Sequence, residues 1–161
     1  MTNLAPAEQL KEYIRENQQA FYRLAYSYTK NPDDAMDVVQ EAVVKAIASV
    51  HKLKKPEFLK TWFYRILVNE ALIFLRKAKK SIPEEDMAAS AVYEDGDVPQ
   101  RLDLERAIAR LEPKIRTVIV LRFFEDMKLE EISRVTRSNL STVKSRLYRG
   151  LQLLKISVSE E

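Results

Sequence analysis

Apolar side chains recur every three or four positions through most of this chain, which is the period of a helix that buries one face. In the first stretch, the positions expected to face inward are Leu10, Ile14, Phe21, Leu24 and Tyr28. Alternation of apolar and polar residues, which is typical of strands, is scarce. The sequence therefore predicts an all-α fold with helices over residues 7–30, 31–50, 58–66, 68–80, 102–111, 115–124, 129–135 and 140–155.

The helix predicted over residues 31–50 carries clear signals at its start. Asn31 can cap the first free amides, Pro32 suits the first helical position, and two acidic residues follow at the positive end of the helix dipole. Residues 51–57 are expected to form a loop, because Pro56 disfavours helical geometry at the residue before it.

Charge divides the chain into three parts. Residues 1–80 hold 14 Lys and Arg against 9 Asp and Glu, and residues 101–161 hold 13 against 9. Residues 81–100 hold six acidic residues and no basic one, lose the helical period and contain two prolines, which is the composition of a linker. We expect two small helical domains joined by a flexible acidic linker. Two interpretations of the acidic charge stay open. The charge serves only to solvate the linker, or the linker folds back on the basic blocks when nucleic acid is absent.

Composition excludes several classes of protein. The 161 residues are 46% apolar and 32% charged, as in soluble globular proteins. Cys is absent and His51 is the only histidine, so an enzyme is disfavoured and no cofactor is expected. No apolar run reaches the roughly 20 residues that span a bilayer, and the first residues lack the pattern of a secretory leader. We therefore expect a cytoplasmic protein.

Residues 129–149 have the spacing of a helix-turn-helix, with Leu129, Ile132 and Val135 on the first short helix. The second helix should turn inward Leu140, Val143, Leu147, Leu151 and Leu154. In such units the second helix enters the DNA major groove. The side chains suited to phosphates and base edges are Ser141, Thr142, Lys144, Ser145, Arg146 and Arg149. The alternative is the solvated side of an ordinary bundle helix.

A polar stripe runs along the helix predicted over residues 31–50. It consists of Asp33, Asp37, Gln40 and Glu41, opposite Ala35, Val39, Ala42, Val43 and Ala46. Repulsion between Asp37 and Glu41 costs roughly 0.2–0.5 kcal/mol, which a pair between Glu41 and Lys45 would partly offset. Three interpretations of this stripe stay open: a docking face for a basic partner, a solvated face, or a weak metal site.

Aromatic and basic residues concentrate between residues 60 and 80, where Trp62, Phe63, Tyr64 and Phe74 stand among Lys60, Arg65, Arg76, Lys77, Lys79 and Lys80. Single-stranded nucleic acid stacks its bases on rings and places its phosphates beside cations. Aromatics at helical spacing also form cores, and we expect Trp62 and Phe63 to be at least partly buried.

Two blocks of the chain resemble the extracytoplasmic-function (ECF) sigma factors of the sigma-70 family. Residues 111–155 resemble region 4 through Pro113, VLRFFE at 120–125, EEIS at 130–133 and TVKSRLYR at 142–149. Residues 20–47, with DAMDVVQE at 34–41, and residues 58–77, FLKTWFYRILVNEALIFLRK, resemble region 2. The resemblance implies a region 2 domain at 1–80, a linker at 81–100 and a region 4 domain at 101–161.

The resemblance also implies a role for each surface of a factor that directs transcription initiation without chemistry of its own. The clamp helices of the largest RNA polymerase subunit would contact Asp34, Asp37, Gln40 and Glu41. Single-stranded minus-10 DNA would contact Lys54, Lys55, Lys60, Trp62, Tyr64, Arg65, Asn69, Arg76 and Lys77. Duplex minus-35 DNA would contact the polar face that begins at Ser141. Further implied partners are the polymerase flap and an anti-sigma factor, which is often membrane-anchored in this family.

One position departs from the family. Arg137 stands where the turn often has Gly, and a non-Gly residue in left-handed geometry costs on the order of 1 kcal/mol. Either the turn is built differently, or Asn139 takes some of the strain. The alternative function is a dimeric helix-turn-helix regulator whose N-terminal half serves dimerisation or effector binding.

Overall fold

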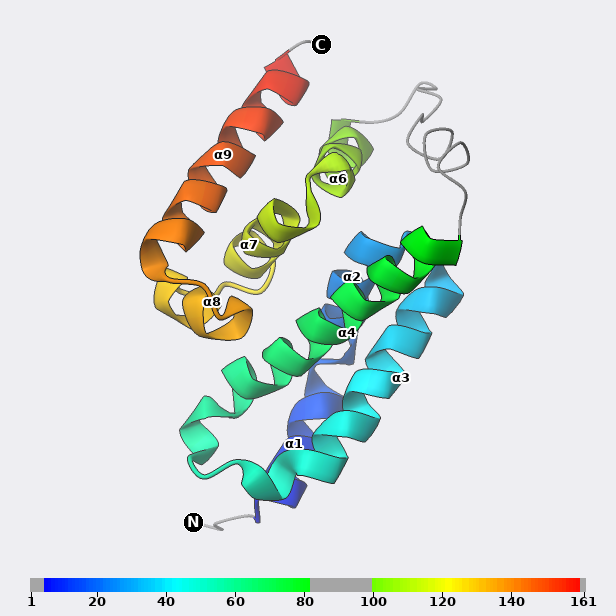
Figure 1. Ribbon diagram of the computed structural model, residues 1–161, viewed down its shortest axis with the longest axis vertical. Coiled ribbons are helices and arrows are strands. Elements are labelled where there is room, and N and C mark those ends of the chain that lie inside the picture. The colour runs from blue at the N-terminus through cyan, green and yellow to red at the C-terminus, as the bar shows by residue number, and fades with distance from the viewer. Residues whose placement is uncertain (1–4, 82–99, 160–161) are drawn as a thin grey trace.

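A computed structural model describes residues 5–81 and 100–159, and every regular element within these two ranges is helical (Figure 1). The first range contains α1 (Pro6–Glu16), α2 (Gln18–Thr29), α3 (Pro32–Ser49), the 3-10 turns η1 (Val50–Lys52) and η2 (Pro56–Phe58), and α4 (Leu59–Ser81). The second contains α6 (Gln100–Arg110), α7 (Pro113–Phe123), α8 (Leu129–Thr136) and α9 (Leu140–Ser159). The all-α prediction is confirmed, and residues 82–99 of the predicted linker lie outside the described residues.

The start of α3 follows its sequence signals. The side-chain oxygen of Asn31 accepts a hydrogen bond from the backbone N–H of Asp34 at 3.0 Å, and Pro32 is the first helical residue. Lys30, just before the cap, has a φ of 57° and ends α2 in left-handed geometry. The predicted boundary between these two helices is therefore confirmed.

The prediction of one helix over residues 7–30 is wrong, because the chain breaks at Asn17. The Asn17 side-chain amide donates to the Tyr13 carbonyl at 2.8 Å, and its backbone N–H donates to the carbonyl of Ile14. These bonds end α1 and allow α2 to start in a new direction. All five residues expected to face inward are nevertheless buried, because both helices turn their apolar faces to one core.

The two helices predicted over residues 58–66 and 68–80 are one continuous helix, α4. Neither Gly nor Pro interrupts residues 59–81. Leu67, at the expected break, is fully buried together with Ala71, and Val68 is nearly so. A buried face that continues across Leu67 favours an unbroken helix.

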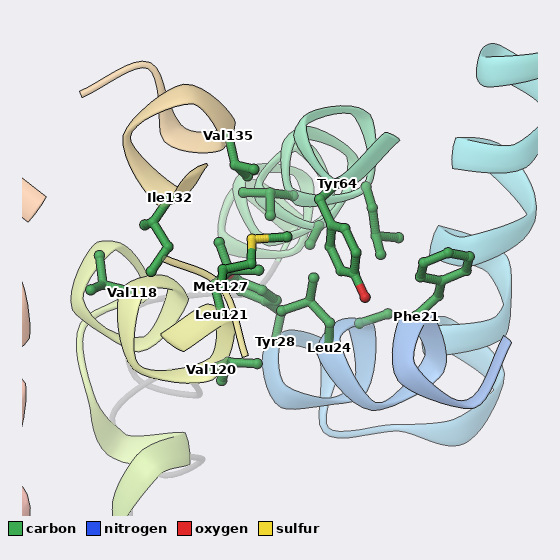
Figure 2. Close-up of a cluster of buried hydrophobic side chains, with 14 of the residues drawn as sticks. Phe21, Leu24, Tyr28, Tyr64, Val118, Val120, Leu121, Met127, Ile132 and Val135 are labelled. Atoms are coloured by element: carbon green, nitrogen blue, oxygen red, sulfur yellow. The ribbon is translucent and has the colours of Figure 1, made fainter. Parts of the chain in front are cut away.

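The two halves of the chain share one hydrophobic core. Helix α4 packs on α8, and α2 packs on α6. Figure 2 shows side chains from α2 and α4 meeting those of α7, α8 and the segment between them. The labelled residues of this core are Phe21, Leu24, Tyr28, Tyr64, Val118, Val120, Leu121, Met127, Ile132 and Val135.

The turn between α8 and α9 is left-handed at Arg137, with φ 55° and ψ 37°. The backbone N–H groups of Arg137 and Ser138 both donate to the Ser133 carbonyl, which closes the end of α8. Asn139 does not share the left-handed geometry. Its side-chain oxygen instead accepts the Thr142 N–H at 2.8 Å and so caps α9. Arg137 therefore takes the conformation that the family often gives to Gly.

Helix α9 packs against α7 at Gly150. A Cβ atom at this position would lie 2.8 Å from the side chain of Ile119, so a larger residue would require this buried side chain to shift. The buried side of α9 runs through Val143, Leu147, Gly150 and Leu154. The prediction that Leu151 faces inward is wrong: it is 39% exposed, because Gly150 occupies the contact line beside it.

Candidate nucleic-acid and protein interfaces

The first turns of α9 present the polar face predicted for duplex DNA. Ser141, Lys144, Ser145 and Arg149 are exposed. Arg146 is half-buried, and its guanidinium donates to the Ser138 hydroxyl at 3.0 Å. Thr142 is also half-buried, and its backbone N–H donates to the Asn139 side chain that caps the helix. The face therefore combines exposed cations with one arginine whose guanidinium is hydrogen-bonded to the turn.

The aromatic and basic block of α4 divides between core and surface. Phe63 is fully buried, and Trp62 is half-buried, as predicted. Trp62 borders a hollow of about 210 Å³ together with Phe58, whose ring lies under Lys55 and Arg134 at 5.9 and 5.2 Å. Rings with cations above them are chemically suited to stacked bases and their phosphates.

Tyr64 needs a correction. It was expected to contact minus-10 DNA, but it is only 2% exposed and points into the core between the two halves (Figure 2). In this arrangement its ring cannot stack on a base. The other residues predicted for this surface remain accessible. Lys54, Lys55, Asn69, Arg76 and Lys77 are exposed, and Lys60, Trp62 and Arg65 are half-buried.

The predicted stripe on α3 is accessible, and it contains apolar residues that sequence reasoning missed. Asp33, Asp37, Gln40 and Glu41 are exposed and Asp34 is half-buried. Among them lie Met36, Val44 and Ile47, which are 47%, 61% and 49% exposed. At 100° per residue Val44 falls between the acidic positions, while Met36 and Ile47 lie along one edge of the stripe beside Gln40, and this was the available signal. An apolar strip edged by acids is typical of a protein-docking surface.

The predicted pair between Glu41 and Lys45 is replaced by a pair between helices. Lys45 of α3 forms an ion pair and hydrogen bond with Glu70 of α4, which is buried. The hydrogen bond to Glu70, more than the charge of Glu41, raises the pKa of Lys45. Because Lys45 pairs with Glu70, Glu41 stays part of the exposed acidic face. Among the described side chains, no three acidic or histidine residues are grouped so that they could hold a metal ion.

Glu125 is the centre of a polar contact between the two halves, which we call the interdomain latch and define as Arg23, Tyr64 and Glu125. The Glu125 carboxylate, 4% exposed, accepts hydrogen bonds from the Tyr64 hydroxyl at 2.7 Å and from the Arg23 guanidinium at 3.2 Å. Burial, and then the hydrogen bond to Glu125, raises the pKa of Tyr64, so the hydroxyl stays protonated. Tyr28 and Thr117 add a second hydroxyl contact.

Arg65 makes another polar contact between the halves. Its Nε and Nη2 atoms donate to the backbone carbonyl of Arg134 in α8, at 3.1 and 2.6 Å. Burial, and then the charge of Arg137, lowers the pKa of Arg65. The surface predicted for minus-10 DNA and the helix-turn-helix predicted for minus-35 DNA therefore face each other across a cleft.

These observations define a two-domain helical protein with a helix-turn-helix beside an acidic docking face. The family model for Sigma-70 region 2 matches residues 13–81, and the model for Sigma-70, region 4 matches residues 101–154. The chain belongs to the ECF group of the sigma-70 family, and it is a bacterial RNA polymerase sigma factor. This favours the sigma function over a dimeric regulator.

Relatives extend over nearly the whole chain. RNA polymerase sigma factor SigV of Bacillus subtilis is 47% identical over 149 residues, which cover 92% of this chain and 90% of the relative. ECF RNA polymerase sigma factor SigW of the same organism is 30% identical over 150 residues, covering 83% and 80%. The sigma factor RpoE in complex with the anti-sigma factor NepR from Bartonella quintana has the same fold, with a TM-score of 0.72, 22% identity, and coverage of 92% of this chain and 98% of that chain. No helix in residues 5–81 or 100–159 is long and apolar enough to cross a membrane.

Proposed function

We propose that this sigma factor binds core RNA polymerase, recognises a two-part promoter and directs initiation by binding alone. The observation that carries the proposal is the presence on one chain of an exposed acidic and apolar face on α3 and a cationic recognition helix, α9. No chemistry on the protein is required. Duplex opening costs a few kcal/mol per extruded base, which contacts to the separated strand can offset.

The polymerase would dock on α3. Asp34, Asp37, Gln40 and Glu41 would pair with basic residues of the clamp helices, and Val44 with its apolar neighbours would be buried in the contact. Acidic rims around apolar centres fix register and speed association. The flap of the polymerase is a second proposed contact, on the region 4 domain.

The two domains would read separate promoter elements. In the domain proposed at residues 1–80, minus-10 DNA would follow Lys60, Arg76 and Lys77 with a base near Trp62. In the domain proposed at 101–161, α9 would enter the major groove of the minus-35 element. Arg146 is the side chain best held for reading a base, since Ser138 fixes its guanidinium.

We further propose that the chain opens when it engages polymerase and promoter. The closed arrangement ties the Arg65 guanidinium to the Arg134 carbonyl of α8, so Arg65 cannot serve single-stranded DNA until the halves separate. Opening would release Arg65 and free the turn at Arg137 from its position opposite Arg65.

An anti-sigma factor is the proposed negative partner. Two solved proteins of similar fold, RpoE and CnrH, are described in complex with the anti-sigma factor NepR and with the cytosolic domain of CnrY. This supports a comparable partner for this chain. We propose that the sigma factor acts in the cytoplasm, and that a membrane-anchored partner would hold it at the membrane until a signal releases it.

Transcription from purified components tests the proposal. Core polymerase from a related bacterium is assayed with and without this protein on a pool of promoter fragments. The expected result is a set of protein-dependent transcripts that start a fixed distance downstream of a shared two-part motif. An absence of new transcripts, together with tight binding to a palindromic duplex, would contradict the proposal and support a dimeric regulator.

A charge-reversal pair tests the docking face. We expect Asp37→Arg with Glu41→Arg to abolish co-purification with core polymerase while the helical circular dichroism stays unchanged. The matched control reverses two exposed acids of α1, Glu12→Arg with Glu16→Arg, and should bind normally. If both double variants bind core polymerase equally well, α3 is not part of the polymerase interface.

A further inference from the structure

The cleft where the two halves meet has a volume of about 400 Å³ and is lined by α4 on one side and by α7, α8, α9 and the turn at Arg137 on the other. Four cationic side chains reach it, one each from α4, α7, the turn after α8 and α9: Arg65, Lys114, Arg137 and Arg146. None of the residues that line it is acidic. The closed arrangement therefore gathers positive charge in one partly enclosed space.

Two of the four cations of the cleft are held in place by hydrogen bonds, and no carboxylate of the lining compensates their charge. The Arg134 carbonyl fixes the Arg65 guanidinium, and the Ser138 hydroxyl fixes that of Arg146. Arg65 and Arg137 repel each other across the cleft, which is one cause of the lowered pKa of Arg65. An anion between them would relieve this repulsion. Arginines fixed in advance lose little entropy when they bind a phosphate.

The rest of the lining is apolar with a few hydrogen-bonding groups. Ile66, Val68, Leu72 and Val135 form the apolar part, while Asn69, Thr136 and Ser138 can donate or accept hydrogen bonds. The volume lies within the range of about 300–1,000 Å³ found for small-ligand sites. A site of this kind suits a ligand that has a flat, weakly polar ring at one end and several negative charges at the other.

We propose that the cleft binds a nucleotide that carries two or three phosphates. The phosphates pair with Arg65, Lys114, Arg137 and Arg146, and the base lies against the apolar wall of α4. A nucleic-acid strand is the other polyanion to weigh. The observations favour the nucleotide, because the space is of small-ligand size and the bonds from Arg65 to α8 keep the walls together.

A ligand that contacts both halves binds the closed state and not the open one. It therefore stabilises the closed state by an amount that grows with its free concentration relative to its dissociation constant. It also occupies Arg65, Asn69 and Arg146, which are proposed DNA contacts. Because of this, the ligand would inhibit promoter binding, and this inhibition rests on the proposed function. Binding of the nucleotide to the cleft does not depend on the proposed function.

Isothermal titration of the free protein, without polymerase or DNA and at fixed ionic strength, tests the binding. The probes are ATP, inorganic tripolyphosphate and adenosine. We expect one ATP per chain, weaker binding of tripolyphosphate because it lacks a ring, and no binding of adenosine. Lys114→Gln and Arg137→Gln should each lower the affinity for ATP at least fivefold. Lys155→Gln, which removes an exposed cation outside the cleft lining, should stay within twofold.

A further variant tests whether ATP binding needs both halves docked together, or only the cations that one half carries. Glu125→Ala removes the centre of the interdomain latch and no lining residue, so it should weaken ATP binding as strongly as Arg137→Gln. Circular dichroism melting checks that each variant is folded at the titration temperature.

Three results would overturn the proposal. These are several ATP molecules per chain, equal affinity in Lys155→Gln and in both lining variants, or a short single-stranded oligonucleotide that displaces ATP and binds more tightly. The last would make the cleft a nucleic-acid site. Failure of the transcription assay leaves this titration unaffected, so the two proposals fail separately.

Discussion

Removal of the Tyr64 hydroxyl is the most direct test of how the two halves are held together. Tyr64→Phe keeps the buried ring and removes only the donor to Glu125, whose carboxylate is 4% exposed. Arg23 then remains as the one described partner of that carboxylate within the latch. We expect the variant to favour separation of the halves while each half stays helical.

The magnitude follows from the burial of the carboxylate. A hydrogen bond to a charged group contributes about 1.5–3 kcal/mol, and a buried acceptor left without its donor loses that amount. Such a loss shifts the equilibrium between closed and open forms by about 10- to 150-fold. The partial exposure of Arg23 allows some water to reach the site, so the lower end of this range is the better expectation.

Fluorescence energy transfer between the halves measures this shift. The chain has no Cys, so single dyes can be attached at Ala48→Cys on α3 and Gln152→Cys on α9, both exposed positions. Loss of transfer is followed against urea. The matched control is Tyr26→Phe, which removes a hydroxyl from a tyrosine of α2 that is 42% exposed, and its midpoint should not move.

Two results would refute the reasoning. If Tyr64→Phe and Tyr26→Phe give the same urea midpoint, the hydrogen bond to Glu125 contributes nothing to docking. If energy transfer and circular dichroism are lost together in every variant, the halves unfold as one cooperative unit and the latch does not control a separate opening step.

Three further predictions follow from other contacts. Asn139→Ala removes the cap of α9 and should lower the free energy of unfolding by about 0.5–2 kcal/mol, measured by thermal melting. Arg146→Ala should weaken binding to a minus-35 duplex by about 1–3 kcal/mol, and equal loss on altered duplexes would make this arginine a phosphate contact. Burial raises the pKa values of Tyr28 and Tyr64 above the unfolded value of 10.0, so their stabilisation is full below pH 10 and is lost as pH rises further. The tyrosinate absorbance of these two residues, isolated as the difference from the Tyr28→Phe and Tyr64→Phe variants, should then appear together with alkaline unfolding. Its appearance in the still-folded protein would contradict the burial argument.

Local signals in the sequence were sufficient for the all-α fold and for several helix boundaries. Asn31 and Pro32 fix the start of α3 through bonds between near neighbours, and the predicted cap is observed. The break at Asn17 was missed, because its amide bond to Tyr13 competes with a helical period that continues on both sides. Met36, Val44 and Ile47 were missed because apolar residues are ordinarily assigned to a core.

The sequence by itself determined the helical class, the helix-turn-helix, the family and the charge of each exposed face, since these depend on periodicity and on residues close in the chain. Only the tertiary structure decided that the two halves share a core, that Tyr64 is buried against Glu125 and that Arg65 faces Arg137. The partners in these contacts are about 60 to 70 residues apart. No local pattern encodes such a pairing, because it depends on how two independently formed apolar faces meet in space.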